Sequence, residues 1–168
     1  MTPIYINSIN EIDRLEREFK QNAELIYEFL TGYKKWLILM LPSLKVNPLD
    51  FSFCSLSNGG FYIRIEELFK QEEVKFNHSN WAMSSEAACI VLTLKTLQLR
   101  TEVLECFRPD SKEFLIVRNK FDALGKYAFL HKEYNQILSE ALGRKLQSYY
   151  CLNDKFIGYC GEINEADY

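Results

Sequence analysis

A strong turn signal occupies residues 56–62, which read Leu56-Ser57-Asn58-Gly59-Gly60-Phe61-Tyr62. Two runs with apolar residues at alternate positions flank it, at 51–55 and 61–65. Because Asn-Gly tolerates the positive φ angles of a tight hairpin, Asn58 and Gly59 predict a two-residue turn between antiparallel strands. Gly60 is expected to form a bulge or to let another backbone approach closely. A phosphate-binding loop would need a helix directly after the glycines, so we interpret Gly59 and Gly60 as structural turn residues.

Length and charge narrow the class of protein. The chain has 168 residues, of which 48% are hydrophobic and 14% aromatic, and its net charge is −3. These values fit one compact domain with a substantial core. They provide neither a basic face for nucleic acid nor the density of a DNA mimic, which must approach about one negative charge per 1.7 Å of duplex. We therefore expect no specific binding to DNA.

The cysteines indicate a reducing environment. The five are dispersed without a Cys-x-x-Cys pair: Cys54, Cys89, Cys106, Cys151 and Cys160. We expect free thiols in a cytoplasmic protein, with no metal and no cofactor. The first ten residues lack the pattern of a signal peptide, and the longest apolar run, at 36–41, is too short to cross a bilayer. We therefore expect no association with membranes.

Hydrophobic periodicity predicts helices on both sides of the hairpin. Ser8 and Glu11 have the spacing of a capping box, and the apolar pattern behind them predicts an amphipathic helix ending near Gly32. Residues 33–41 fit either a short helix or a buried strand. Residues 74–77 are expected to add a third short strand to the hairpin.

The second half of the chain predicts three more helices. The first follows the hydroxyl cap of Ser84, has Glu86 as the acid of its first turn, and extends to about Cys106. It is apolar on most of its circumference and should therefore be buried centrally. Ser111 caps the next helix, and the last covers about 133–146.

These elements predict an α+β fold, in which an antiparallel β-meander packs against several helices in a single compact domain. The domain is expected to cover residues 1–146. Residues 147–168 are rich in aromatic and acidic side chains and are expected to form a C-terminal appendage, with a hairpin and a frayed acidic end.

No catalytic constellation is apparent from the order of residues. His78 and His131 each lack a neighbouring nucleophile or a spaced carboxylate of the kind that marks a triad. We therefore interpret the protein as a non-enzyme. The alternative is an enzyme whose site assembles in space from His78, His131 and scattered acids.

Three segments carry a resemblance to a known family. Residues 56–62 resemble the core motif of the antirestriction family typified by ArdB and KlcA. Asn80-Trp81 with the alanine-rich segment 84–94 is similar to the family's second block, and residues 124–133 are similar to its late helix. The resemblance covers about 25–142. This chain lacks the family's aromatic stretch before the hairpin and has Lys132 in place of a proline, so it resembles a divergent member.

The resemblance implies a function. Members are carried by plasmids, phages or other mobile elements and relieve host type I restriction of unmodified DNA. They are not DNA mimics, have no established enzymatic activity, and combine an antiparallel sheet with flanking helices. The implied partner is a type I restriction enzyme or an associated host factor. The alternative is an interaction module of the same fold that inhibits another defence system or neutralises a toxin.

Four motif residues are candidates for an interaction surface: Asn58, Tyr62, Asn80 and Trp81. Each also has a structural interpretation. A tryptophan before a helix often packs that helix onto a sheet, although tryptophan is also common where interfaces concentrate binding energy. For Tyr62, both interpretations are open.

Overall fold

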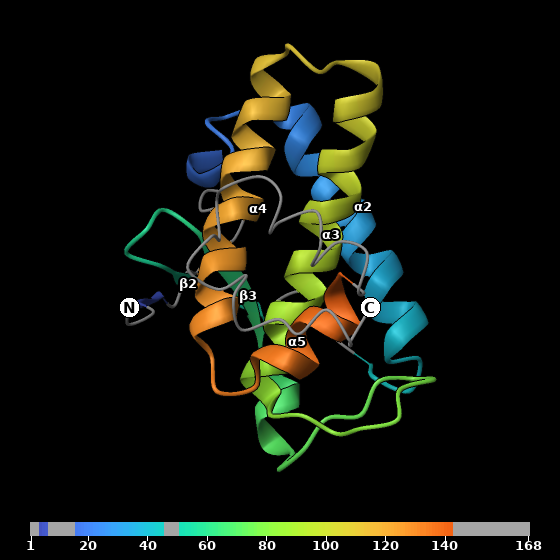
Figure 1. Ribbon diagram of the computed structural model, residues 1–168. Coiled ribbons are helices and arrows are strands. Elements are labelled where there is room, and N and C mark those ends of the chain that lie inside the picture. Colours follow the sequence, from blue (N-terminus) through green and yellow to red (C-terminus); the bar gives the residue numbers. More distant parts are fainter. Residues whose placement is uncertain (1–3, 7–15, 46–50, 143–168) are drawn as a thin grey trace, which may run out of the picture.

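A computed structural model describes residues 4–6, 16–45 and 51–142 of the chain. Its elements are β1 (Ile4–Ile6), α2 (Ala23–Met40), β2 (Phe51–Ser55), β3 (Phe61–Ile65), the 3₁₀ helix η2 (Glu66–Lys70), α3 (Ser85–Phe107), α4 (Lys112–Leu130) and α5 (Tyr134–Ala141). Helix α3 lies between α2 and α4, α5 packs beside its N-terminal half, and the small sheet lies behind (Figure 1). The α+β class is confirmed. None of the helices in the described ranges is both long and apolar enough to span a membrane.

The sheet contains the predicted hairpin but a different third strand. Strands β2 and β3 pair antiparallel, with Phe53 opposite Ile63, and the strand order is β1-β2-β3. The prediction of a strand at 74–77 was wrong. Val74 makes only an isolated bridge with Met83, whereas β1 pairs with the other edge of β2. The alternation at 74–77 is real, but it serves a local two-residue contact that holds the loop before α3.

Helix α2 begins and ends at other residues than the sequence predicts. It starts after Asn22, whose side chain accepts a hydrogen bond from the Leu25 amide, and it runs through Gly32 to Met40. The predicted end near Gly32 was therefore wrong, and the segment 33–41 is helical. A glycine inside a helix costs about 1 kcal/mol, and the burial of Tyr33 offsets it. The predicted start at Ser8 lies outside the described residues.

Helix α3 is buried centrally, as its composition predicts. Ser84 caps it by accepting from the Ala87 amide. Helix α3 also covers β3. This strand lies at the edge of the sheet, where its outward amides have no neighbouring strand to bond with. The Ile63 amide donates to Thr93 Oγ1 at 3.1 Å and the Ile65 amide to Cys89 Sγ at 3.4 Å. These two bonds fix the position of the sheet on the helix.

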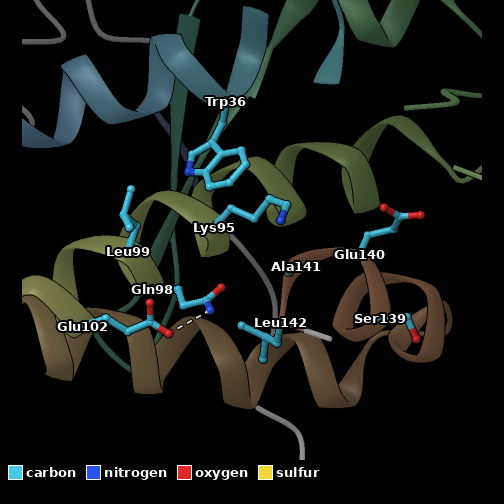
Figure 2. Close-up of a pocket in the computed structure, with 9 residues that line it drawn as sticks. All are labelled: Trp36, Lys95, Gln98, Leu99, Glu102, Ser139, Glu140, Ala141 and Leu142. Carbon is cyan, nitrogen blue, oxygen red and sulfur yellow. Dashed lines mark hydrogen bonds between the residues drawn. The ribbon is translucent and has the colours of Figure 1, made fainter. Parts of the chain in front are cut away.

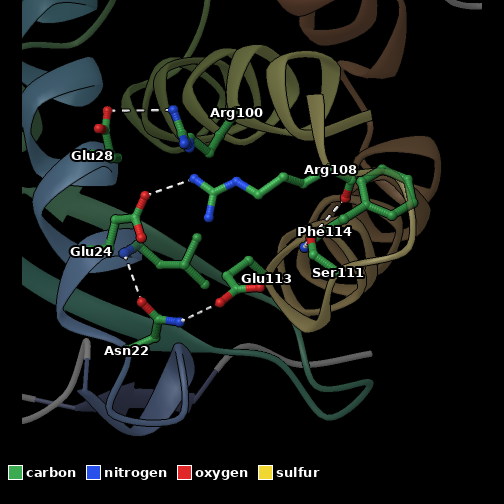
Figure 3. Close-up of polar contacts among 9 residues, drawn as sticks. Asn22, Glu24, Glu28, Arg100, Arg108, Ser111, Glu113 and Phe114 are labelled. Atoms are coloured by element: carbon green, nitrogen blue, oxygen red, sulfur yellow. Dashed lines mark hydrogen bonds and ion pairs between the residues drawn. The ribbon is translucent and has the colours of Figure 1, made fainter. Parts of the chain in front are cut away.

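Ion pairs join the start of α2 to the far end of α3. Arg108 reaches Glu24 at 2.8 Å, and Arg100 reaches Glu28 at 3.3 Å (Figure 3). Beside them, the amide group of Asn22 donates to Glu113 at 3.5 Å. Three helices are thus connected at one end of the molecule.

Helix α4 begins at its predicted cap, whereas α5 is shorter than the predicted 133–146. Ser111 accepts from the Phe114 amide and begins α4. Helix α5 ends at Ala141, and residues beyond 142, including the predicted appendage, lie outside the described part of the chain. The domain boundary at 146 therefore stays a prediction.

Candidate functional site around Glu86

The loop between β2 and β3 has three residues, 57–59, in place of the predicted two. Beyond the last strand pair, Ser55 and Phe61, the Leu56 amide still donates to the Gly60 carbonyl. The Gly59 amide donates to the Leu56 carbonyl and closes the turn. Gly59 has a φ of 88°, whereas Asn58 keeps a negative φ. The loop is therefore a turn that ends in a left-handed glycine, the second common solution for hairpins.

Asn58 has no positive φ angle, and its contribution to the loop is made by its side chain. Its Nδ2 donates to the Ala123 carbonyl on α4 at 2.7 Å, and its Oδ1 accepts from the Gly60 amide at 3.1 Å. Gly60 lies so close to α4 that a Cβ atom there would be 3.1 Å from Ala123 Cβ and from the Leu124 nitrogen. The motif loop is thus held against α4.

Glu86, in the first turn of α3, is the centre of a polar cluster. Its Oε1 accepts from the hydroxyls of Tyr62 at 3.0 Å and Tyr127 at 2.9 Å. Its Oε2 lies 3.2 Å from His131 Nε2. Tyr62 comes from β3, and Tyr127 and His131 come from the end of α4. The three segments that carry the family resemblance therefore meet at one carboxylate.

The hydrogen bonds define the protonation of the cluster. His131 Nδ1 accepts from the Glu133 amide at 3.1 Å, so Nε2 carries the proton that is donated to Glu86. The bond from His131, opposed by burial and supported by the hydroxyls of Tyr127 and Tyr62, lowers the pKa of Glu86 to about 2. The carboxylate is therefore ionised at neutral pH.

Glu133 extends the cluster to the start of α3. Its carboxylate accepts from the Ser84 amide at 2.9 Å and also from the Ser84 hydroxyl. Ser84 in turn caps α3, so the connection between α4 and α5 positions the helix that carries Glu86. Since both ring nitrogens of His131 are engaged, the imidazole has no lone pair left for a substrate proton. The arrangement is suited to holding three elements together.

The four predicted surface residues fall into two groups. Tyr62 is completely buried, so its assignment to a surface was wrong, because its hydroxyl is needed at Glu86. Asn58 is half-buried and bonded to α4. Asn80 is exposed and Trp81 is 42% exposed. A surface role for Asn80 and Trp81 stays a prediction.

The loop that carries Trp81 is well anchored. The Ser79 hydroxyl donates to the Glu140 carboxylate on α5, and its oxygen accepts from the Trp81 amide at 3.4 Å. The Asn77 amide donates to the carbonyl of Met40, the last residue of α2. Trp81 is therefore presented from a fixed backbone, which lowers the entropy that binding would cost.

His78 does not join this site. It is exposed, has a φ of 66°, and contributes to none of the hydrogen bonds of the Glu86 cluster. Within the described ranges, no group of three or more His, Cys, Asp or Glu side chains could hold a metal ion. Of the two histidines, the structure therefore brings only His131 to Glu86.

Comparisons with known proteins place the fold. No protein-family model matches the sequence, and no curated protein matches it significantly. The structure is similar to a solved structure of the KlcA and ArdB proteins, described as having a novel fold and antirestriction activity against type I DNA restriction systems in vivo but not in vitro. The TM-score is 0.57 at 22% sequence identity, and the match covers 83% of this chain and 94% of the other. The chain therefore has the fold of these proteins, as its three motif segments predict.

Proposed function

We propose that this protein is a divergent antirestriction protein that relieves type I restriction of unmodified DNA in the cell. The observation that carries the proposal is the convergence at Glu86 of three family-like segments, in a fold similar to that of KlcA and ArdB. A shared fold alone would be compatible with many functions. Here the fold is accompanied by three segments that resemble the family's motifs and that meet at one carboxylate, which favours a common role.

The proposed mode of action is contact with a protein. A net charge of −3 on 168 residues is too weak to imitate duplex DNA, and acids such as Glu24, Glu28 and Glu66 are paired with arginines. The solved relative is described as active in vivo but not in vitro. We therefore propose that the partner is a type I restriction enzyme as it is organised in the cell, or a host factor associated with it. We also propose that the protein acts in the cytoplasm and that a mobile genetic element carries its gene.

The proposed action involves no catalysis. His131, the histidine of the site, donates through one ring nitrogen and accepts through the other. Glu86 accepts three hydrogen bonds and is held ionised. Both side chains thus form hydrogen bonds that hold the fold together. We assign the contact with the partner to the exposed Asn80 and Trp81.

Transformation tests this proposal. Unmodified plasmid DNA is introduced into two hosts that differ only in an active type I system, each with and without the protein. We expect the protein to raise the transformation frequency in the restricting host alone, while the plasmid recovered from the non-restricting host keeps its original methylation. Equal frequencies with and without well-expressed protein, across several type I systems, would overturn the proposal and favour a module directed at another defence system or a toxin.

A further inference from the structure

A groove lies between α2, α3 and α5, outside the Glu86 cluster. Its volume is about 420 Å³. Side chains from all three helices line it: Trp36, Lys95, Gln98, Leu99, Glu102, Ser139, Glu140, Ala141 and Leu142 (Figure 2). This volume falls within the range of about 300–1,000 Å³ that is typical of ligand pockets. The groove can therefore admit one or two side chains of a partner.

Lys95 is the inner charge of the groove. Its Nζ lies 4.4 Å from the centre of the Trp36 ring, and Figure 2 shows the amine between Trp36 and α5. The side chain is half-buried, and its burial lowers the pKa of the amine, although Glu140 opposes the shift. Among the described residues, Lys95 forms no ion pair. Within the described part of the chain, this partly dehydrated cation therefore has no bonded anion.

The two carboxylates of the groove form hydrogen bonds with side chains other than Lys95. Glu102 is exposed and accepts from Gln98 Nε2 at 3.1 Å, so water screens its charge. Glu140 bonds to the Ser79 hydroxyl. Trp36, which is half-buried, and Leu99, which is 44% exposed, supply apolar surface to a lining that also contains polar side chains. The groove thus combines one inner cation with an apolar wall.

We propose that this groove binds a segment of the partner protein that places a carboxylate at Lys95 and an apolar side chain against Trp36 and Leu99. The inference rests on the proposed function, because it assumes that the protein acts through contact with another protein. A carboxylate would pair with the amine of Lys95 in a position where burial strengthens the interaction. The acidic group selects the partner, and the apolar side chain supplies contact area.

Ser79 links the groove to the loop that carries Asn80 and Trp81. Ser79 bonds both to Glu140, which lines the groove, and to the backbone of Trp81. One partner segment could therefore contact the exposed Trp81 and reach Lys95. The groove extends the interaction surface beyond the residues that the sequence singles out.

NMR titration of the full chain tests the chemistry with defined probes. Phenylbutyrate carries the carboxylate and an apolar ring, phenylbutanamide is its neutral analogue, and phenylbutylamine carries the opposite charge. We expect saturable shifts of the Trp36 indole signal with phenylbutyrate, and an affinity at least about tenfold lower for the amide and the amine. The Trp36 signal is identified as the one that a Trp36→Phe variant lacks.

Two lysine variants sharpen the test. Lys95→Met keeps the aliphatic stem and should lower the affinity for phenylbutyrate by about tenfold or more. Lys112→Met, at an exposed position in the first turn of α4, should leave it unchanged. Equal binding of the three probes, or full affinity of a folded Lys95→Met, would overturn the proposal. An absence of saturable shifts would also overturn it, including the case in which the groove is filled by another part of the chain.

The transformation assay separates this proposal from the function on which it rests. If the unaltered protein gives no relief, the proposed function fails, and the titration alone decides the chemistry of the groove. If the unaltered protein gives relief, we expect Lys95→Met to reduce it and Lys112→Met to retain it at matched thermal stability. Full relief by Lys95→Met would overturn the groove as a partner site and leave the antirestriction function standing.

Discussion

The rings of Tyr62 and Tyr127 stack nearly parallel, with centroids 6.2 Å apart and 10° between their planes, and both hydroxyls donate to the same oxygen of Glu86. One tyrosine comes from the sheet and the other from α4, while the acceptor belongs to α3. The pair therefore acts as a joint between three elements. Removing any member leaves a buried polar atom of another without its partner, which is costly.

The first prediction concerns the pH dependence of stability. The pKa of Glu86 is lowered to about 2 from 4.5, so this carboxylate stabilises the fold above pH 4.5 and loses that contribution as the pH falls toward 2. At neutral pH the contribution is at most about 3 kcal/mol, less where water reaches the carboxylate. We expect Glu86→Gln to be less stable than the unaltered protein at pH 7 and the difference to shrink at pH 3.

Urea unfolding followed by circular dichroism measures this difference. Because other carboxylates titrate in the same range, the comparison is between the two proteins at each pH and not along one curve. A gap in unfolding free energy that stays constant from pH 7 to pH 3 would show that ionised Glu86 does not hold the cluster together.

The second prediction separates the scaffold from the surface. Tyr62→Phe removes one donor to Glu86 and should lower the free energy of unfolding by about 1–2 kcal/mol, yet retain restriction relief when folded. Trp81→Ala removes a side chain that is 42% exposed and should cost less than about 1 kcal/mol while reducing relief. Thermal melts and the transformation assay are measured on both. If a folded Trp81→Ala variant gives full restriction relief, Trp81 serves packing alone and does not contact the partner.

The third prediction concerns three glycines with different surroundings. Gly59→Val should cost more than about 1 kcal/mol, because a β-branched residue resists a φ of 88°. Gly60→Ala should cost about 1–3 kcal/mol, because its Cβ would press on the backbone of α4. Gly32→Ala is the matched control: its Cβ would lie 3.4 Å from Thr96 Cγ2, and the change should stabilise α2 by up to about 1 kcal/mol. Equal melting temperatures for all three variants would contradict this geometry.

The fourth prediction concerns thiol reactivity. Burial raises the pKa of Cys54 to about 11 and that of Cys89 to about 12, and neither thiol is accessible. Cys106 is exposed. Iodoacetamide should therefore label Cys106 in the native protein, and should label Cys54 and Cys89 only after denaturation. Peptide mapping by mass spectrometry measures the three sites separately, and native labelling of Cys89 at the rate of Cys106 would be the contrary result.

The sequence predicts best where a local rule and the packing agree. The caps at Ser84 and Ser111 and the central burial of α3 follow from residue type and periodicity alone. Gly32 misleads because a glycine near the end of an apolar pattern is a stop signal, whereas here the helix continues and packs against α3. Residues 74–77 mislead because alternation does not say with which segment a strand pairs.

The site could be predicted only in part. Resemblance singled out segments that contain Tyr62, Glu86, Tyr127 and His131, yet sequence order gave no reason to place them around one carboxylate. Glu86 also suits a helix start, and that simpler explanation hides its second role. Both faces of β3 are buried, since Phe61 packs against Phe29 of α2 and Tyr62 against Tyr127 of α4, and alternation along a strand does not predict burial of both faces. The groove at Lys95 has no sequence signal, because its lining comes from three separate helices.

The most direct test of restriction relief is the plating efficiency of phage on a host with an active type I system. Unmodified phage and phage already modified by that system are plated side by side, with the protein expressed or absent, and a host without the system is the control. We predict that the protein raises the plating of unmodified phage toward that of modified phage and changes neither count on the control host. If well-expressed protein leaves the ratio of unmodified to modified plaques unchanged for every type I family tested, antirestriction by this route is contradicted.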